Sequence, residues 1–203
     1  MKNYLCINGK KIELSAEKLE ELRASLSEPQ TQLLDKKIGE IARIGEYEFI
    51  VLDQFGDSTA LILKDLLQDD VKFGENNNDF RESNVLPILR DFAKVIEELV
   101  GVGNLLEHDV DLTSDDGLKD YGIIKEKMSL LTAENYRRYV DVLDMDRLEK
   151  YYWLATPYST NRHENDRWVK CVSPAGGVDG NRYDCIYIGL RPFCILKSDI
   201  FVS

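Results

Sequence analysis

Residues 153–159 read WLATPYS, residues 168–174 read WVKCVSP and residues 189–196 read GLRPFCIL. The first two stretches combine aromatic and aliphatic residues, which is typical of strands, and each runs into a proline, which has no N–H to donate to a strand ladder. In the third, Pro192 belongs at the start of a strand, and Arg191 offers a rigid, charged fork that can bind loop carbonyls or carboxylates. We therefore expect strands over 153–155, 168–172, 185–188 and 192–196, with a turn over 173–177.

These motifs, with NNN at 76–78, RESNV at 81–85 and MSLLT at 128–132, resemble an uncharacterised family of clostridial and phage proteins. That family is associated with the C-type-lectin-like fold in its formylglycine-generating-enzyme-like version. Ligand-binding variable proteins of diversity-generating retroelements use this fold and end in a similar Gly-aliphatic-Arg-Pro signature. The resemblance covers residues 38–203 and implies an α+β domain with antiparallel strands and two main helices. It is a weaker guide to function, because one fold hosts unrelated activities.

The chain has 203 residues and a formal net charge of −11. Such a surface repels nucleic acid unless basic residues cluster, and the basic clusters are no longer than pairs such as Lys10-Lys11, so we expect no nucleic-acid partner. No apolar run approaches the roughly 18 residues of a membrane helix, so no membrane insertion is expected. The first residues lack the apolar region of a signal peptide. We expect synthesis in the cytoplasm without export by that route; association with a phage particle released by lysis stays open.

Four cysteines stand at positions 6, 171, 185 and 194, and none forms a Cys-x-x-Cys pair. This spacing does not indicate a zinc ribbon, and we expect buried, reduced thiols. In the oxidoreductase branch of the resembled fold, two close cysteines bind copper and carry the chemistry. Here thirteen and eight residues separate the last three cysteines, which does not match that arrangement. We therefore expect no cofactor.

The N-terminal residues predict a small unit. Residues 4–14 alternate in a hairpin pattern around Asn8-Gly9, a pair that tolerates the positive φ angles of a two-residue turn. Ser15 can cap a helix over 16–26, and residues 27–32 have the composition of a linker. Because 36 residues are too few for a core of their own, we expect residues 1–36 to pack on the domain formed by 38–203 or to form an oligomerisation arm on another subunit.

The middle of the chain predicts alternating strands and helices. Residues 41–44, 47–52 and 59–63 are β-rich runs that indicate a meander, and the polar residues 69–82 indicate a surface loop. A helix capped by Ser83 or Asn84 should follow and end at Gly101. Its apolar stripe comprises Val85, Leu89, Phe92, Ile96 and Leu99.

A second helix is expected after a short strand at 128–131. Thr132 is its predicted cap, and the helix should cover 133–148. Its apolar side comprises Tyr136, Tyr139, Val140 and Leu143.

Residues 107–120 contain six acidic side chains. The spacing does not fit a helix-loop-helix calcium loop, because the glycine and the terminal glutamate fall in the wrong places. We expect a solvated loop. A looser calcium site of loop carboxylates and carbonyls is the alternative.

Two segments after residue 153 have the composition of an adaptable binding surface. Residues 160–167 and 179–184 mix Asn, Arg, Tyr, His and Asp, and Tyr and Arg dominate binding hot spots. Plain polar loops are the alternative explanation. Since the segments flank predicted strands 168–172 and 185–188, both can lie at one end of a sheet. We predict that the following residues form one ligand-binding face: Arg162, His163, Asn165, Asp166, Arg167, Asp179, Asn181, Arg182, Tyr183, Asp184 and Tyr187.

Three large side chains should anchor the core beneath this face: Trp153, Trp168 and Phe193. In the variable proteins that this chain resembles, randomised positions cluster between the tryptophans and the Gly-Leu-Arg-Pro motif. The sequence contains two histidines, His108 and His163, and neither stands in a recognisable catalytic motif, so we expect ordinary roles for both.

Three functions remain open. The first is a non-enzymatic module that binds a protein or glycan ligand, such as a receptor-recognition or displayed variable protein of a phage or prophage. The second is an oxidoreductase of the formylglycine-generating type, which the cysteine spacing disfavours. The third is a structural or assembly subunit of a phage particle. An exposed cluster of aromatic and arginine side chains would favour the first function over the third.

Overall fold

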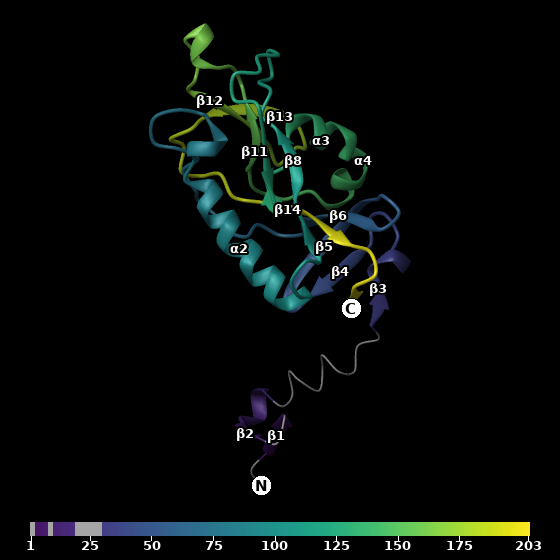
Figure 1. The fold of residues 1–203 in the computed structure, drawn as a ribbon. Coiled ribbons are helices and arrows are strands. Elements are labelled where there is room, and N and C mark those ends of the chain that lie inside the picture. The colour runs from purple at the N-terminus through teal and green to yellow at the C-terminus, as the bar shows by residue number, and fades with distance from the viewer. Residues whose placement is uncertain (1–2, 8–9, 19–29) are drawn as a thin grey trace.

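The largest sheet is antiparallel and has six strands in the computed structural model, which describes residues 3–7, 10–18 and 30–203 (Figure 1). Its order is β10-β14-β6-β5-β4, and β7 also pairs with β14. The strands are β4 (Ile41–Ile44), β5 (Tyr47–Gln54), β6 (Ser58–Leu63), β7 (Leu105–Leu106), β10 (Met128–Ser129) and β14 (Phe193–Lys197). The meander and the strand after Pro192 are therefore confirmed, as is the α+β class with mostly antiparallel strands.

Both faces of this central sheet are buried. Phe49 and Val51 of β5 belong to one apolar cluster, whereas Ile50 and Leu52 belong to a second. Successive residues of a strand point to opposite faces, so the continuous apolar run of β5 indicates cover on both sides.

Helices supply much of this cover (Figure 1). The helix α2 (Val85–Val100) packs its buried stripe into the first cluster, and α3 (Ala133–Arg138) and α4 (Val140–Leu143) pack into the second. The predicted stripe of α2 is confirmed except at Leu99, which is 48% exposed. Leu99 lies over the β4–β5 turn, where a Cβ on Gly45 would come within 2.9 Å of its methyl group. Gly101, at φ +90°, ends the helix as predicted.

The helix predicted over 133–148 is shorter than expected. Thr132 caps it by accepting a hydrogen bond from the Asn135 N–H, but the helix breaks at Tyr139, whose φ is −105°. A short second helix then ends at Leu143, and a 3₁₀ turn covers Asp144–Asp146. Two β-branched valines and several aspartates give this segment low helix propensity, which explains the early end.

A second antiparallel sheet has the order β11-β12-β13. It comprises β11 (Tyr152–Pro157), β12 (Trp168–Val172) and β13 (Val178–Arg182), so the strands predicted around Trp153 and Trp168 are confirmed. The strand predicted over 185–188 is wrong: those residues form turns, and β13 lies where a polar loop was expected. As an edge strand, β13 needs backbone pairing with β12 only, so its polar side chains do not prevent it from forming. The apolar Ile188, which suggested a strand over 185–188, is buried in the core without belonging to a strand.

Three short antiparallel pairs complete the described strands. They are β1 (Asn3–Ile7) with β2 (Lys10–Leu14), β3 (Thr31–Gln32) with β15 (Phe201–Val202), and β8 (His108–Asp111) with β9 (Ile123–Glu126). The N-terminal hairpin is thus confirmed, and the Ser15 hydroxyl accepts a hydrogen bond from the Lys18 N–H. The predicted Asn8-Gly9 turn and most of the helix over 16–26 lie outside the described residues.

The chain joins the larger body earlier than the predicted boundary. Residues Thr31–Gln32, expected in a linker, pair with the last strand, and Leu33 is fully buried in the core. Gln54 adds hydrogen bonds to the carbonyls of residues 33, 34 and 36. Residues 31–36 therefore belong with 38–203, while the separate role of the preceding residues stays a prediction.

The prediction of a polar surface loop over 69–82 is wrong for its centre. Phe73, Asn78 and Phe80 are fully buried. The Phe73 ring lies 5.5 Å from the Trp153 ring at an interplanar angle of 63°, and the Trp153 indole N–H donates to the Val71 carbonyl at 2.8 Å. Aromatic burial therefore outweighs the polar composition of this segment.

Arg191 is a buried scaffold residue, as predicted, with 1% of its surface exposed. Its Nε donates to the Leu63 carbonyl at 2.9 Å, and a terminal nitrogen donates to the Lys64 carbonyl at 2.8 Å. The guanidinium also pairs with Asp146 at 3.3 Å and lies over the Tyr152 ring. Arg191 therefore joins the end of β6 to the second sheet and to the turn after α4.

We predict that Arg191→Lys lowers the free energy of unfolding by about 1–3 kcal/mol. A single ammonium group cannot satisfy both carbonyls and stay over the Tyr152 ring, so buried acceptors lose their donors. Urea unfolding followed by tryptophan fluorescence measures the effect. The matched control is Arg138→Lys, because Arg138 is exposed and pairs with Asp53; it should change stability by less than about 0.5 kcal/mol. An equal loss in both variants would contradict the assignment.

Candidate functional site

The β12–β13 pairing brings the two predicted loop segments together. Trp168 lies opposite Arg182, and one step beyond this pair the Tyr183 N–H donates to the Arg167 carbonyl at 2.9 Å. The chain entering β12 and the chain leaving β13 are therefore neighbours at one end of the second sheet.

One side of this sheet carries a cluster that we call the aromatic face: Tyr158, Trp168, Lys170, Gly180 and Arg182. Tyr158 and Trp168 are 44% and 41% exposed, and the Tyr158 N–H donates to the Trp168 carbonyl at 2.9 Å. The Lys170 ammonium lies 5.4 Å from the centre of the Tyr158 ring. Gly180 is opposite Lys170, and a Cβ there would be 3.9 Å from the same ring. Strand alternation then places Trp168 and Arg182 on this side too.

Trp168 was expected in the core, and that prediction is wrong, whereas Trp153 and Phe193 are buried as predicted. The reason is register. Val169 and Cys171 fill the inward positions of β12, so their neighbours 168 and 170 must point to the other side. The polar Lys170 between Val169 and Cys171 is a signal that could have placed Trp168 on the side away from the core.

The predicted site residues fall into groups that face different neighbours. Arg182, on the aromatic face, forms a two-bond ion pair with Asp184, at 3.0 and 2.7 Å. Asn181 points to the inward side of β13, where its side chain donates to the Cys171 sulfur and accepts from the Tyr187 hydroxyl. Asp179 is exposed nearer the 173–177 turn.

The remaining predicted residues precede β12 or follow β13. Arg162 and His163 lie in the 3₁₀ turn Asn161–His163, and both are exposed. Asn165 and Asp166 are half-buried, Arg167 is exposed, and Tyr183 is half-buried against the core. The structure thus brings most of these side chains to one end of the sheet but divides them between its two sides.

The acidic segment forms ion pairs and hydrogen bonds with the segment before β12. Asp120 accepts from the Thr160 hydroxyl at 2.6 Å and forms an ion pair with Arg162. Asp115 pairs with Lys170 at 3.3 Å and with Arg137 at 3.0 Å. All six acidic residues of the segment are exposed, as expected of a solvated charge run, but these carboxylates also bind nearby cations and hydroxyls.

Asp116 is the most strongly perturbed of these carboxylates. Desolvation opposes its charge, but hydrogen bonds from Ser114, Ser159 and His163 outweigh that effect and lower its pKa to about 2. The Ser159 hydroxyl donates at 2.6 Å, and the His163 Nδ1 lies 2.9 Å away. Within residues 3–7, 10–18 and 30–203, no cluster of three acidic, histidine or cysteine side chains is arranged to hold a metal ion.

A serine–histidine pair that the sequence did not reveal lies inside the protein. The His108 Nε2 is 2.8 Å from the Ser129 hydroxyl, and the imidazole packs edge-on against Phe193. Ser129 is 1% exposed, and Glu126, which faces His108 across the strand pair, forms an ion pair with Arg90. A catalytic pair must reach its substrate, so this buried arrangement does not form an accessible nucleophile.

The described cysteines are free thiols, and two of them are buried as predicted. Burial raises the pKa of Cys171 to about 11 and that of Cys194 to about 12. Both thiols are therefore protonated at neutral pH and poor nucleophiles. Cys185 is half-buried near the Tyr187 hydroxyl. The side chain of Cys6 lies outside the described part of the chain.

No known protein family, curated protein or solved structure matches this chain. In the described parts of the chain, none of the helices combines the length and the apolar character needed to span a bilayer.

We predict that His108 makes the protein less stable in acid. Burial lowers its pKa from 6.5 to about 4, so the native protein holds the imidazole neutral while the unfolded chain takes up a proton near pH 6.5. Its contribution is complete above pH 6.5 and is lost as the pH falls from 6.5 to 4. Between pH 7 and pH 4.5 the loss is about 2–3 kcal/mol.

Urea unfolding at pH 7 and pH 4.5 measures this loss, which should be smaller in His108→Gln. His163→Gln is the control, since His163 is exposed, and it should keep the acid loss due to His108. If His108→Gln loses as much stability in acid as the wild type, the imidazole does not carry the effect.

Proposed function

We propose that the chain is a non-enzymatic binding protein that presents the aromatic face and its neighbouring loops to a protein or glycan ligand. The observation that carries the proposal is the exposure of two neighbouring aromatic residues, Trp168 at the start of β12 and Tyr158 just after β11, with Arg182 opposite Trp168. Exposed aromatic rings and arginines supply most of the energy at binding hot spots. An aromatic ring can also stack on the apolar face of a sugar.

The backbone that carries these side chains is held in place by its neighbours, which supports the same function. Backbone pairing with β11 and β13 fixes the position of β12, and Asp116 and Asp120 fasten the segment before it through hydrogen bonds from Ser159, His163 and Thr160 and an ion pair with Arg162. A preformed surface loses less conformational entropy on binding than a loop that must become ordered. Among the predicted residues, Arg182 and its partner Asp184 lie beside Trp168, and the exposed Arg162, His163 and Arg167 at the same end of the sheet add adaptable hydrogen-bonding groups.

The motif resemblance supports a finer proposal. On that basis the residues from 38 onward adopt the C-type-lectin-like fold, and the loops beside the aromatic face correspond to the diversified region of retroelement variable proteins. The observed α+β architecture with antiparallel sheets is compatible with this assignment. The same resemblance supports a phage or prophage setting. The hairpin β1–β2 supports an oligomerisation role for the N-terminal residues.

We predict that Trp168→Ala weakens ligand binding by roughly 30-fold or more, because truncation of a hot-spot aromatic costs about 2 kcal/mol. Arg182→Ala should weaken the same interactions. The measurement is binding of the purified chain to an array of immobilised glycans and proteins, followed by affinity titration against the hits. Phe201→Ala is the control, since Phe201 is 64% exposed on β15, outside the aromatic face; it should bind like the wild type.

Thermal unfolding of the same variants separates binding from folding. Trp168→Ala and Arg182→Ala should each change stability by less than about 1 kcal/mol, because the altered side chains are exposed. Unchanged affinity in both variants would refute the proposed face, as would equal losses in Phe201→Ala. Catalytic turnover of a ligand found on the array would instead favour the oxidoreductase alternative.

A further inference from the structure

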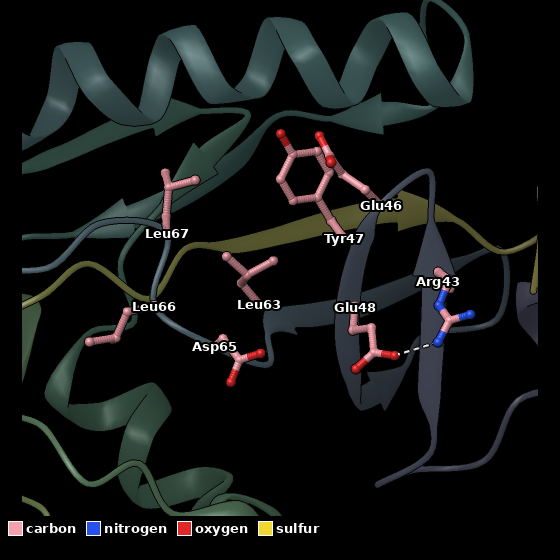
Figure 2. A pocket seen from close by; sticks show the side chains of 8 residues that line it. All are labelled: Arg43, Glu46, Tyr47, Glu48, Leu63, Asp65, Leu66 and Leu67. Atoms are coloured by element: carbon pink, nitrogen blue, oxygen red, sulfur yellow. Dashed lines mark hydrogen bonds and ion pairs between the residues drawn. The ribbon is translucent and has the colours of Figure 1, made fainter. Parts of the chain in front are cut away.

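A cavity of about 490 Å³ opens on the central sheet, between the β4–β5 turn and the segment that follows β6 (Figure 2). One part of its lining is apolar and comprises Tyr47, Leu63, Leu66 and Leu67. This lining is formed by different strands from those of the aromatic face, so the cavity is a separate candidate site.

Backbone contacts fix the walls of the cavity. The Leu63 carbonyl accepts from Arg191 at 2.9 Å, the Lys64 N–H donates to the Glu48 carbonyl at 2.9 Å, and the Leu67 N–H donates to the Leu190 carbonyl at 2.8 Å. The Tyr47 ring packs edge-on against Phe92 of α2, with 5.0 Å between ring centres. A ligand would therefore meet a site that is already formed.

The charges around the cavity are unbalanced. Glu48 binds two cations, Arg43 at 2.6 Å and Lys64 at 2.8 Å, and these interactions lower its pKa. Glu46 and Asp65 also line the cavity and are exposed. Across residues 30–203, neither of these two carboxylates has a lysine, arginine or histidine within ion-pair distance. Three carboxylates and two cations thus leave an excess of one negative charge beside an apolar, partly aromatic wall.

We propose that this cavity binds an alkylammonium ion, which is an ammonium group on an aliphatic chain. The leucines would cover the aliphatic part, while Glu46 beside the Tyr47 ring would attract the ammonium group and Asp65, on the other side of Leu63, would add to the negative potential (Figure 2). The same chemistry occurs in free alkylamines and in the lysine side chain of a partner protein. An alkyl carboxylate of equal length would be repelled by the same two carboxylates.

The test is a chemical-shift titration of the full-length ¹⁵N-labelled protein with n-butylammonium, butyrate and butanol at constant ionic strength. Butylammonium should cause saturable shifts at residues 43–48 and 63–67, with a dissociation constant on the order of 1 mM. Butyrate and butanol should bind at least roughly fivefold more weakly. Equal affinities for the three compounds, or shifts that do not saturate, would overturn the proposal.

Substitutions at the two carboxylates test whether butylammonium binds at this cavity. Glu46→Gln and Asp65→Asn combined should weaken butylammonium binding by roughly fivefold or more. Asp57→Asn is the matched control, because Asp57 is an exposed carboxylate at the opposite end of β5 and β6, and it should leave the affinity unchanged. An equal loss in the control would overturn the proposal. A capped Gly-Lys-Gly peptide tests the source: tighter binding than butylammonium assigns the site to lysine side chains, and weaker binding assigns it to free amines.

Discussion

The buried side chain of Asn78 holds together the segments that carry the aromatic face. Its amide nitrogen donates to the carbonyls of Ser159 and Trp168 at 2.9 and 2.8 Å, and its oxygen accepts from the Tyr121 hydroxyl at 2.8 Å. Burial raises the pKa of Tyr121 to about 12, so this hydroxyl stays a donor at neutral pH. Removing a buried amide leaves its partners unsatisfied, which is costly. The position of the exposed rings therefore depends on a residue that no ligand would touch.

Arg191 is a second buried side chain that holds separate segments together, here between the two sheets. It fastens the carbonyls at the end of β6 while stacking on Tyr152 of β11, so the rigid central sheet supports the smaller sheet above it. The carbonyl of Leu63 that Arg191 holds also belongs to a residue lining the proposed ammonium site. Two buried polar side chains, Asn78 and Arg191, thus connect the core to the two candidate surfaces. The residues that stabilise the fold are therefore different from the exposed residues that are available to bind a ligand.

Much of this architecture could be predicted from local patterns. Short β-rich apolar runs identified β5, β6, β11 and β12, the helical stripe identified α2, and the step from Arg191 to proline identified a scaffold residue. The errors arose where contacts between distant segments of the chain determine the local structure. Strand β13 pairs through its backbone and contains Gly180, so its side chains give little strand signal. The polar composition around Asn78 predicts an exposed loop, but Phe73 and Phe80 are buried and Phe73 packs against Trp153. The two candidate segments meet at one end of the second sheet, but β13 replaces part of the second predicted loop, and the positions of the two exposed rings depend on register.

Amide hydrogen exchange followed by NMR tests the central claim, which is that the aromatic face is preformed and held from beneath by Asn78. The informative amides are those of Tyr158 and Tyr183, which donate to the carbonyls of Trp168 and Arg167. We predict protection comparable to that of β5 and β6 in the wild type. In Asn78→Ala, protection at Tyr158 should fall at least about tenfold while β5 and β6 stay protected. Exchange of these two amides at exposed-loop rates in the wild type, or no change in the variant, would contradict the account.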